Sequence, residues 1–416
     1  MLPAARTNPG SEAMLTALFT SVSAVCVTGL ATVDTATFWT PFGQAVIMAL
    51  IQEGGFGIMA LATLLALLVR KTVGLRGQLI AQSESRTLNF GDVRSVLFAV
   101  ARIMLLFEAG TALILTARFW IAYDHNPASA LWHGTFHAVS AFNNAGFALF
   151  SDNLIGVAGD PWIIVPVCAA IVAGGLGFPV LISLLHGGIR ARDWTVHMRL
   201  TVYGSLFLLA AGAALFGAFE WNRQQTLGPM PAGGKILATL AGTVFPRTAG
   251  FNSIDYGAAS PETLLVTDTL MFIGGGSAGT AGGIKVTTFL VLFFAIWNEV
   301  RGRDHVTIAH RSISAPSQRQ ALSVALLGVA AVIAGTLLLL MFTDLPLEKV
   351  LFESISAFAT VGLSTGITPG LPADAQWVLM VLMFTGRIGT ITVASALALS
   401  SRPRLYQLPE ERPVIG

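Results

Sequence analysis

Charged side chains are scarce in this sequence. Only 11% of the 416 residues are Asp, Glu, Lys or Arg, whereas a soluble domain carries about 25%. With 54% hydrophobic residues and a mean hydropathy of +0.72, the chain has too few charges to cover a surface in water. The composition therefore excludes a soluble globular protein and predicts an integral membrane protein.

Features that mark several other function classes are also missing. The net charge is only +2, which gives no sign of a general affinity for nucleic acid. The two cysteines, Cys26 and Cys168, lie in apolar stretches and do not suggest a disulfide framework. The sequence shows no nucleophile–base set, no metal-ligand cluster and no fingerprint for an organic cofactor, so we expect that it is not an enzyme.

One short pattern, by contrast, occurs four times. Each copy ends in a Gly that follows small or polar residues and precedes a large apolar residue. The copies are Cys26-Val27-Thr28-Gly29, Asn143-Asn144-Ala145-Gly146, Arg247-Thr248-Ala249-Gly250 and Ala359-Thr360-Val361-Gly362. The four glycines are 117, 104 and 112 residues apart, which predicts four related structural units.

Each Gly motif follows an apolar segment too short to cross a bilayer, which takes about 20 residues. These segments lie at 11–24, 128–142, 233–246 and 347–358. Longer apolar runs lie at 41–70, 95–123, 162–186, 196–219, 262–298, 320–343 and 374–400. We therefore expect an all-α membrane protein of four pseudo-repeats around one pore. Each would comprise a spanning helix, a pore half-helix, a Gly loop and a second spanning helix.

The repeats divide the chain into five parts. Residues 1–92 are the first pore unit and a cytosolic loop, 93–194 the second unit, 195–315 the third, 316–401 the fourth, and 402–416 a cytosolic tail. The first unit lacks a spanning helix before its half-helix. Either this unit functions without that helix or, as we favour, the gene product begins upstream of Met1.

Basic residues are unevenly distributed between alternate loops. The loops after 41–70, 162–186 and 262–298, and the tail, each carry at least three Arg or Lys, whereas the opposite side is sparse. The positive-inside rule makes the Arg-rich side cytoplasmic. The Gly loops then open outward, and the C-terminus lies in the cytoplasm.

A cation that loses its water in a membrane needs other oxygen atoms, and four loops around one axis can supply rings of backbone carbonyls. Gly reaches positive φ and adds no side chain to the pore, while each half-helix directs its negative C-terminal end inward. Thr28 and Thr360 add hydroxyl groups or pack behind the loops. Packing glycines between spanning helices are the alternative, but four copies at matched spacing favour a cation-selective filter made of these sixteen motif residues.

The motifs also resemble a known family. The matching segments are Ser23 to Leu30 with Asp34, Phe136-His137 with Phe142 to Phe147, Arg247 to Asn252, and Gly282-Gly283-Ile284-Lys285. They are similar to the Trk/Ktr/HKT superfamily of potassium transporters, most of all to the bacterial Ktr membrane subunit, over nearly the whole chain. The missing first outer helix departs from that family's eight-span pattern.

The resemblance implies K⁺ uptake, with K⁺ as the transported ion, across the bacterial cytoplasmic (inner) membrane. It further implies a homodimer and a cytosolic ring of nucleotide-binding regulatory subunits. Whether Na⁺ acts as an activator stays open. A Na⁺-permeable or proton-coupled transporter is the first alternative. The resemblance argues against it, because Na⁺-selective members of the superfamily have Ser in place of the first motif Gly, whereas this chain has Gly at all four positions. A membrane sensor is the second, but the short loops contain no signalling domain.

A glycine-rich stretch interrupts the run at 262–298. It does not fit Gly-x4-Gly-Lys-Ser/Thr, and it lies in an apolar span, so nucleotide binding is not expected. One interpretation is a flexible break with close helix packing; the other, which the resemblance implies and we favour, is an intramembrane gate. The predicted gate residues are Gly274, Gly275, Gly276, Ser277, Ala278, Gly279, Thr280, Ala281, Gly282, Gly283, Lys285 and Arg387.

Arg387 lies within an apolar span, where a charge is costly and indicates function unless it forms a structural pair. The resemblance places it below the filter. Lys285 is expected either to act as a second fixed positive charge near Arg387 or to extend its side chain to the cytosolic surface. Glu53 is either a partner for Arg387 or faces a water-filled cavity, and for Glu108 and Asp268, as for Glu53, we favour a structural role.

Other polar residues accompany the half-helices. His133 and His137 are expected to cap or pack the second half-helix. Glu353 is expected to hold a filter loop by hydrogen bonds, and Arg247 to do the same through a carboxylate behind the filter.

Overall fold

The computed structural model describes residues 3–7, 13–72, 93–187, 194–303, 305–308 and 311–389. Helices dominate these residues. The first half contains η1 (Pro3–Ala5), α1 (Ala13–Val25), α2 (Thr35–Phe38), α3 (Pro41–Thr72), α5 (Val93–Phe119), η2 (Trp120–Asp124), α6 (Pro127–Asn143), α7 (Pro161–Leu176) and α8 (Phe178–Gly187). The second half contains α9 (Val196–Glu220), α10 (Ala232–Val244), α11 (Pro261–Phe272), α12 (Val286–Val300), α13 (Ala315–Phe342), α14 (Leu347–Phe358), η4 (Thr368–Gly370), α15 (Ala373–Phe384) and η5 (Thr385–Gly389). A short hairpin pairs β1 (Thr307–Ile308) with β2 (Arg311–Ser312).

Within the described residues, four helices are long and apolar enough to cross a membrane: α3, α5 with η2, α9 and α13. The pair α7 and α8 passes the same test but is bent by 107°. The predicted run at 262–298 divides into α11 and α12, with the glycine-rich stretch between them. The last predicted span begins as α15 and η5, and its remainder, 390–400, lies outside the described residues.

The four short segments form helices close to the predicted bounds, namely α1, α6, α10 and α14. Local signals define their starts. Asn126 caps α6 by accepting a hydrogen bond from the Ala128 amide, and Pro127 occupies the first turn, where a missing amide hydrogen costs nothing. Pro231 and Pro346 instead occupy the N-cap positions of α10 and α14, where they make no side-chain cap hydrogen bond.

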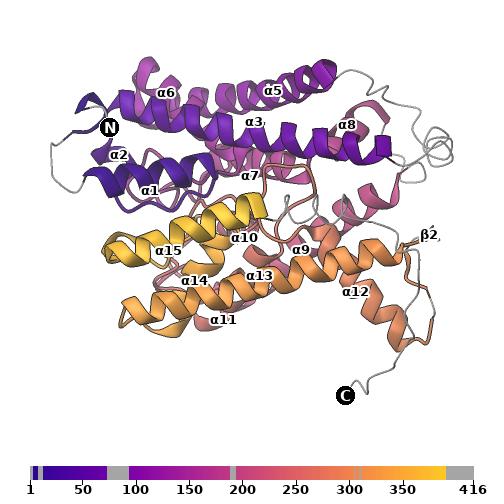
Figure 1. The fold of residues 1–416 in the computed structure, drawn as a ribbon. Helices are drawn as coiled ribbons and strands as arrows, with labels where there is room; N and C mark the ends of the chain where they lie inside the picture. Colours follow the sequence, from indigo (N-terminus) through magenta and orange to yellow (C-terminus); the bar gives the residue numbers. More distant parts are fainter. Residues whose placement is uncertain are drawn as a thin grey trace.

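The contacts of these helices connect the four units in a closed circle. Within the units, α1 packs on α3, α6 on α5 and α7, α10 on α9, and α14 on α13 and α15. Between the units, α3 contacts α6, α7 contacts α10, α11 contacts α14, and α15 contacts α1. In Figure 1, α3 and α5 run side by side along one edge, α13 runs along the other, and α1 and α15 lie between them. Each half-helix therefore packs against helices of its own unit and of a neighbouring unit.

The core follows the repeated motif. The large apolar residue after each motif glycine is at most 2% exposed; these residues are Leu30, Phe147, Phe251 and Leu363. Burying such side chains contributes about 1.5–3 kcal/mol each relative to exposure. The motif therefore anchors each loop in the core immediately after its glycine.

The inner helix of the second unit differs from the prediction of a continuous span at 162–186. It bends at Gly177, where φ is +91°, a conformation that favours glycine. A Cβ on Gly177 would lie 2.3 Å from the carbonyl oxygen of Ser277. Pro179 follows, and it supplies no amide hydrogen to continue the helix. The bend thus lets the glycine-rich stretch approach α7 closely.

Candidate ion-conduction site

The four Gly motifs meet in one closed ring. A Cβ added to any of the four glycines would collide with the carbonyl oxygen just before the glycine of the next unit. The pairs are Gly29 with Ala145 (2.3 Å), Gly146 with Ala249 (2.8 Å), Gly250 with Val361 (2.3 Å) and Gly362 with Thr28 (2.1 Å). Since the fourth loop returns to the first, the loops surround one axis.

The four loops also share one backbone conformation. In every motif the second and fourth residues have positive φ. The second residues are Val27 (54°), Asn144 (60°), Thr248 (67°) and Thr360 (49°), and the fourth are Gly29 (96°), Gly146 (71°), Gly250 (71°) and Gly362 (98°). Positive φ is uncommon for residues other than glycine and unfavourable for β-branched ones. Four matched copies therefore indicate a conformation that the tertiary structure enforces.

Serines that the sequence analysis did not single out hold three of the loops. Ser23 and Ser356 lie six residues before the motif glycines, and their hydroxyl oxygens accept hydrogen bonds from the amides of Gly29 (3.0 Å) and Gly362 (3.1 Å). Ser140 has the same spacing and donates to the Phe147 carbonyl at 2.7 Å. The third unit has Val244 at this position. The sequence signal for this role was a serine six residues before the motif glycine in three of the four repeats.

Removing one of these hydroxyls tests how the loops are held. In Ser356→Ala the part-buried amide of Gly362 loses its partner, which costs about 1 kcal/mol. We expect a lower midpoint of thermal unfolding in detergent and a smaller increase of that midpoint when K⁺ is added, because a bound ion stabilises only a loop that can hold it. Ser323→Ala is the control, since the Ser323 hydroxyl bonds an exposed helical carbonyl. Equal midpoints and equal K⁺ responses would contradict this role for Ser356.

The second loop is fixed by a buried polar cluster. The side-chain amide of Asn143 donates to Gln52 (3.1 Å) and to Glu108 (3.0 Å), and Gln52 also donates to Glu108 (3.1 Å). Glu108 is 5% exposed. The favoured structural role of Glu108 therefore agrees with its contacts, and the side chain of Asn143 points away from the ring toward α3 and α5.

Among the described residues Arg247 binds no carboxylate, contrary to the suggestion from the sequence. Its guanidinium donates to the carbonyl (3.2 Å) and hydroxyl (3.1 Å) of Ser205 on α9, and to the Gly274 carbonyl (3.1 Å). The Nε atom has no partner among the described residues. Arg247 therefore joins the third loop to α9 and to the start of the glycine-rich stretch.

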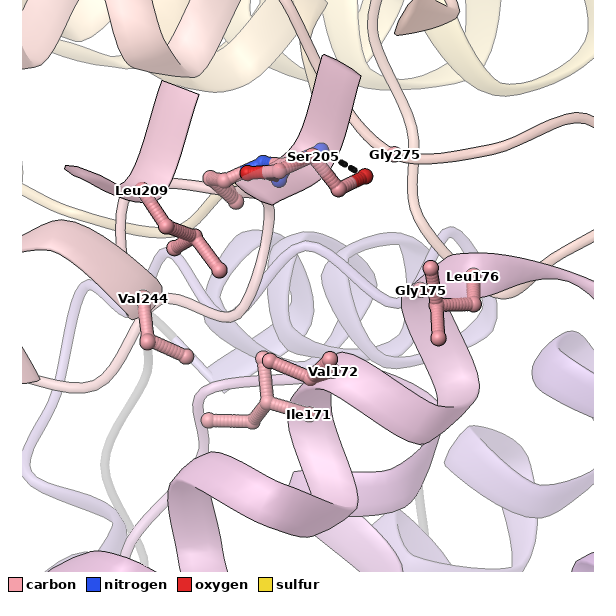
Figure 2. Close-up of a pocket in the computed structure, with 9 residues that line it drawn as sticks. Ile171, Val172, Gly175, Leu176, Ser205, Leu209, Val244 and Gly275 are labelled. Carbon is pink, nitrogen blue, oxygen red and sulfur yellow. Dashed lines mark hydrogen bonds between the residues drawn. The ribbon is translucent and has the colours of Figure 1, made fainter. Parts of the chain in front are cut away.

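A cavity of about 20 Å³ lies beside Arg247. Figure 2 shows Ile171 and Val172 from α7, Leu209 from α9 and Val244 from α10 facing it, with Gly275 on another side. It is large enough for one water molecule, which the guanidinium at its wall can bind.

The glycine-rich stretch, 274–283, contacts residues of the second, third and fourth units. The Gly274 amide donates to the Ile284 carbonyl (2.9 Å), and the Gly282 amide to the Thr248 hydroxyl (3.2 Å). In the middle of the stretch, the Gly276 amide donates to the Gly175 carbonyl (2.7 Å). The Ala278 carbonyl accepts a hydrogen bond from the Phe178 amide (3.1 Å). A Cβ on Gly282 would lie 2.0 Å from the Thr360 hydroxyl oxygen. The stretch is therefore packed directly against the third and fourth loops and against the bend at Gly177.

The structure brings Arg387 to this stretch. Its Nη1 donates to the Thr280 carbonyl, and its Nε and Nη2 have no partner among the described residues although the side chain is only 3% exposed. Lys285 donates to the carbonyl of Ala281, the residue after Thr280, so the two basic side chains bind adjacent carbonyls of the stretch. Glu53 is exposed and forms no ion pair with Arg387 within the described part of the chain. The suggested Glu53–Arg387 pair is therefore wrong, and Lys285 binds inside the protein.

Asp34 and Asn153 connect the segments that follow the loops. Asp34 accepts a hydrogen bond from the Ser151 hydroxyl at 2.6 Å. Burial alone would raise the pKa of Asp34, but hydrogen bonds from Ser151, the Ala36 amide and Thr37 outweigh it and lower that pKa. Asn153, which the sequence analysis missed, donates to the Gly146 carbonyl (3.3 Å) and accepts from the Asn252 amide (3.1 Å). These contacts join the first three units beyond the ring.

The remaining candidates lie on α6, α14 and α11. His137 bonds the His133 carbonyl (2.7 Å) and the Leu149 amide (3.3 Å), so it packs α6 against the segment after the second loop, as expected. Glu353 is fully buried and accepts from the Thr368 hydroxyl. Asp268 is 7% exposed on α11, and its Oδ1 has no partner among the described residues.

Known proteins resemble this chain over most of its length. A family model described as TrkH, cation transport protein, matches residues 4–403. The Ktr system potassium uptake protein B of Bacillus subtilis (strain 168) is 38% identical over 97% of this chain and 90% of that protein. The protein of the same name from Vibrio alginolyticus is 35% identical over 96% and 88%. The potassium/sodium uptake protein NtpJ of Enterococcus hirae is 33% identical over 98% and 90%.

A solved structure shares the fold. The crystal structure of the potassium transporter TrkH from Vibrio parahaemolyticus superposes with a TM-score of 0.70 at 18% identity, covering 93% of this chain and 78% of that one. The expected all-α membrane architecture is thereby confirmed. Because the family model matches nearly the whole chain and the three relatives described above each exceed 30% identity, this chain belongs to the TrkH family of cation transport proteins.

Proposed function

We propose that this chain conducts K⁺ passively across the bacterial cytoplasmic membrane into the cell. The observation that carries the proposal is the closed ring of four Gly loops, each in contact with the next. Such a ring presents backbone carbonyls to one axis, where they replace the water of a dehydrated cation. The relatives from B. subtilis and V. alginolyticus, which are potassium uptake proteins, support the choice of ion.

In this proposal the sixteen motif residues form the selectivity filter, and four pore units with the predicted boundaries surround it. The half-helices α1, α6, α10 and α14 end at the loops and direct the negative ends of their dipoles toward the ion. The Gly loops open outward, and the Arg-rich loops and C-terminal tail face the cytoplasm. Residues 274–283, Lys285 and Arg387 form the gate below the filter.

A relative named for both potassium and sodium keeps Na⁺ permeation as the second candidate. Gly at all four filter positions favours K⁺, since the resemblance implies that Na⁺-selective members of the superfamily have Ser at the first of these positions. The deciding measurement is ion entry into liposomes that contain the purified full-length chain, driven in turn by K⁺ and Na⁺ gradients. Preferential K⁺ entry supports the proposal, whereas equal entry of both ions favours the second candidate, and no entry of either contradicts conduction.

The proposal includes a cytosolic nucleotide-binding subunit that docks on the Arg-rich loops and the tail of a homodimer. An ungated K⁺ pore would dissipate the membrane potential, and the names of two relatives place them in a system of components. Purification from the native membrane at low salt is expected to recover a second, soluble protein, and added ATP or ADP is expected to change K⁺ flux severalfold. High salt, which screens the Arg contacts, should release this protein. Recovery of the chain alone, with flux insensitive to nucleotide, would contradict this part of the proposal.

A further inference from the structure

One residue of the glycine-rich stretch joins three separate elements. The Thr280 amide donates to the Gly174 carbonyl of α7 at 3.2 Å, and its hydroxyl donates to the Phe142 carbonyl of α6 at 3.2 Å. Its own carbonyl accepts a hydrogen bond from Arg387. Thr280 is completely buried. Among the predicted gate residues it is therefore bound at once to the second and the fourth units.

The two ends of the stretch are held in a different way. Gly274 and Gly282 bond the third unit, through Arg247 and Thr248 respectively. Ile273 and Ile284 pair as a parallel bridge, which closes the base of the stretch. The third unit thus hydrogen-bonds both ends, whereas the hydrogen bonds of the middle, 275–281, reach the second and the fourth units.

The backbone of α6 and α7 packs closely around Thr280. A Cβ on Gly174 would lie 1.9 Å from the Phe142 carbonyl oxygen and 2.8 Å from the Thr280 hydroxyl. The absence of that atom lets the hydroxyl reach the carbonyl. Phe142 precedes the second motif directly, so the hydrogen bond ends at the last turn of the half-helix that supports the second loop.

We propose that Thr280 is the latch of the closed gate: its hydroxyl fastens the middle of the stretch to the second filter loop through the Phe142 carbonyl, while its carbonyl receives Arg387. This inference rests on the proposed gating function. To leave the pore, the stretch must break the bonds at Thr280, and the Phe142 carbonyl loses its partner when it does. Thr280 is a positioning residue that sets the balance between closed and open gates.

The test compares two substitutions in the full-length protein in liposomes. Thr280→Val keeps the shape and removes the donor, whereas Thr280→Ser keeps the donor. A buried hydrogen bond of ordinary strength corresponds to about a fivefold shift of the closed–open balance. We expect Thr280→Val to raise K⁺ flux about fivefold with an unchanged K⁺/Na⁺ ratio, and Thr280→Ser to retain wild-type flux. Thr269→Val, which removes a hydroxyl that bonds within α11, is the control and should change neither.

A second measurement does not depend on conduction. Amide hydrogen exchange of a peptide covering 274–285 should be about fivefold faster in Thr280→Val than in Thr280→Ser or the wild type, because the latch limits opening. Wild-type flux together with wild-type exchange in folded Thr280→Val overturns the latch. If Arg387→Ala and deletion of Gly275 to Gly279 raise K⁺ flux in the same assay, only the proposed role of Thr280 is contradicted. If these variants also leave K⁺ flux unchanged, the proposed gating function itself is contradicted.

Discussion

Gly29→Ser is expected to lower the K⁺/Na⁺ preference about tenfold and to reduce K⁺ flux. Gly29 has a φ of +96°, and its added Cβ would lie 2.3 Å from the Ala145 carbonyl oxygen. That distance is far below van der Waals contact, so the loop of the second unit must move. The strained backbone of a residue with a side chain costs about 1–2 kcal/mol, and 1.4 kcal/mol corresponds to about a factor of ten. A displaced carbonyl and an added hydroxyl both alter the oxygen ring that selects the ion.

The matched control is Gly57→Ser in the same unit. Gly57 lies on α3, and a Cβ there would meet no atom within 4 Å. Flux of each cation into liposomes is measured for both variants, after size-exclusion chromatography has shown that each remains folded. The control should behave as the wild type. If Gly29→Ser also keeps the wild-type K⁺/Na⁺ ratio, Gly29 does not line the filter.

The sequence predicted the parts of the fold that local signals determine. Prolines and capping residues bound the half-helices, and the predicted 347–358 coincides with α14 (Leu347–Phe358). The matched spacing of the four glycines identified the loops that meet in the ring. The bend at Gly177 was missed because its cause is not local: the bend accommodates Ser277, which is 100 residues farther along the chain. Glycines before such a bend are indistinguishable in sequence from glycines that pack straight helices.

Side-chain partners were the least predictable part of the site. Arg247 could have been expected to seek a carboxylate, since a buried charge without a partner is costly. Instead, two carbonyl oxygens and one hydroxyl accept its hydrogen bonds. Such acceptors leave no trace in the sequence, because every residue has a backbone carbonyl. The same holds for Arg387, whose partner is the carbonyl of Thr280 rather than an acidic side chain.

Arg387→Ala is expected to raise K⁺ flux about tenfold without a change in the K⁺/Na⁺ ratio. The Arg387 side chain is 3% exposed and hydrogen-bonded to the glycine-rich stretch, and Lys285 binds the next carbonyl of that stretch. Charges so far from bulk water are weakly screened. Repulsion of only about 1.4 kcal/mol on a passing K⁺ corresponds to the tenfold factor. The ratio should stay constant because the substitution leaves the four Gly loops unchanged.

Two further variants separate charge from position. Arg387→Lys keeps the charge and should stay nearer to wild-type flux, whereas deletion of Gly275 to Gly279 removes the middle of the stretch and should raise flux in the same way as Arg387→Ala. Arg319→Ala, at an exposed arginine near the start of α13, is the matched control for loss of a positive charge. All variants are checked for folding before K⁺ and Na⁺ entry are measured. Wild-type flux in both Arg387→Ala and the deletion would mean that the main barrier lies elsewhere, because neither the fixed charge nor the stretch would then oppose the ion.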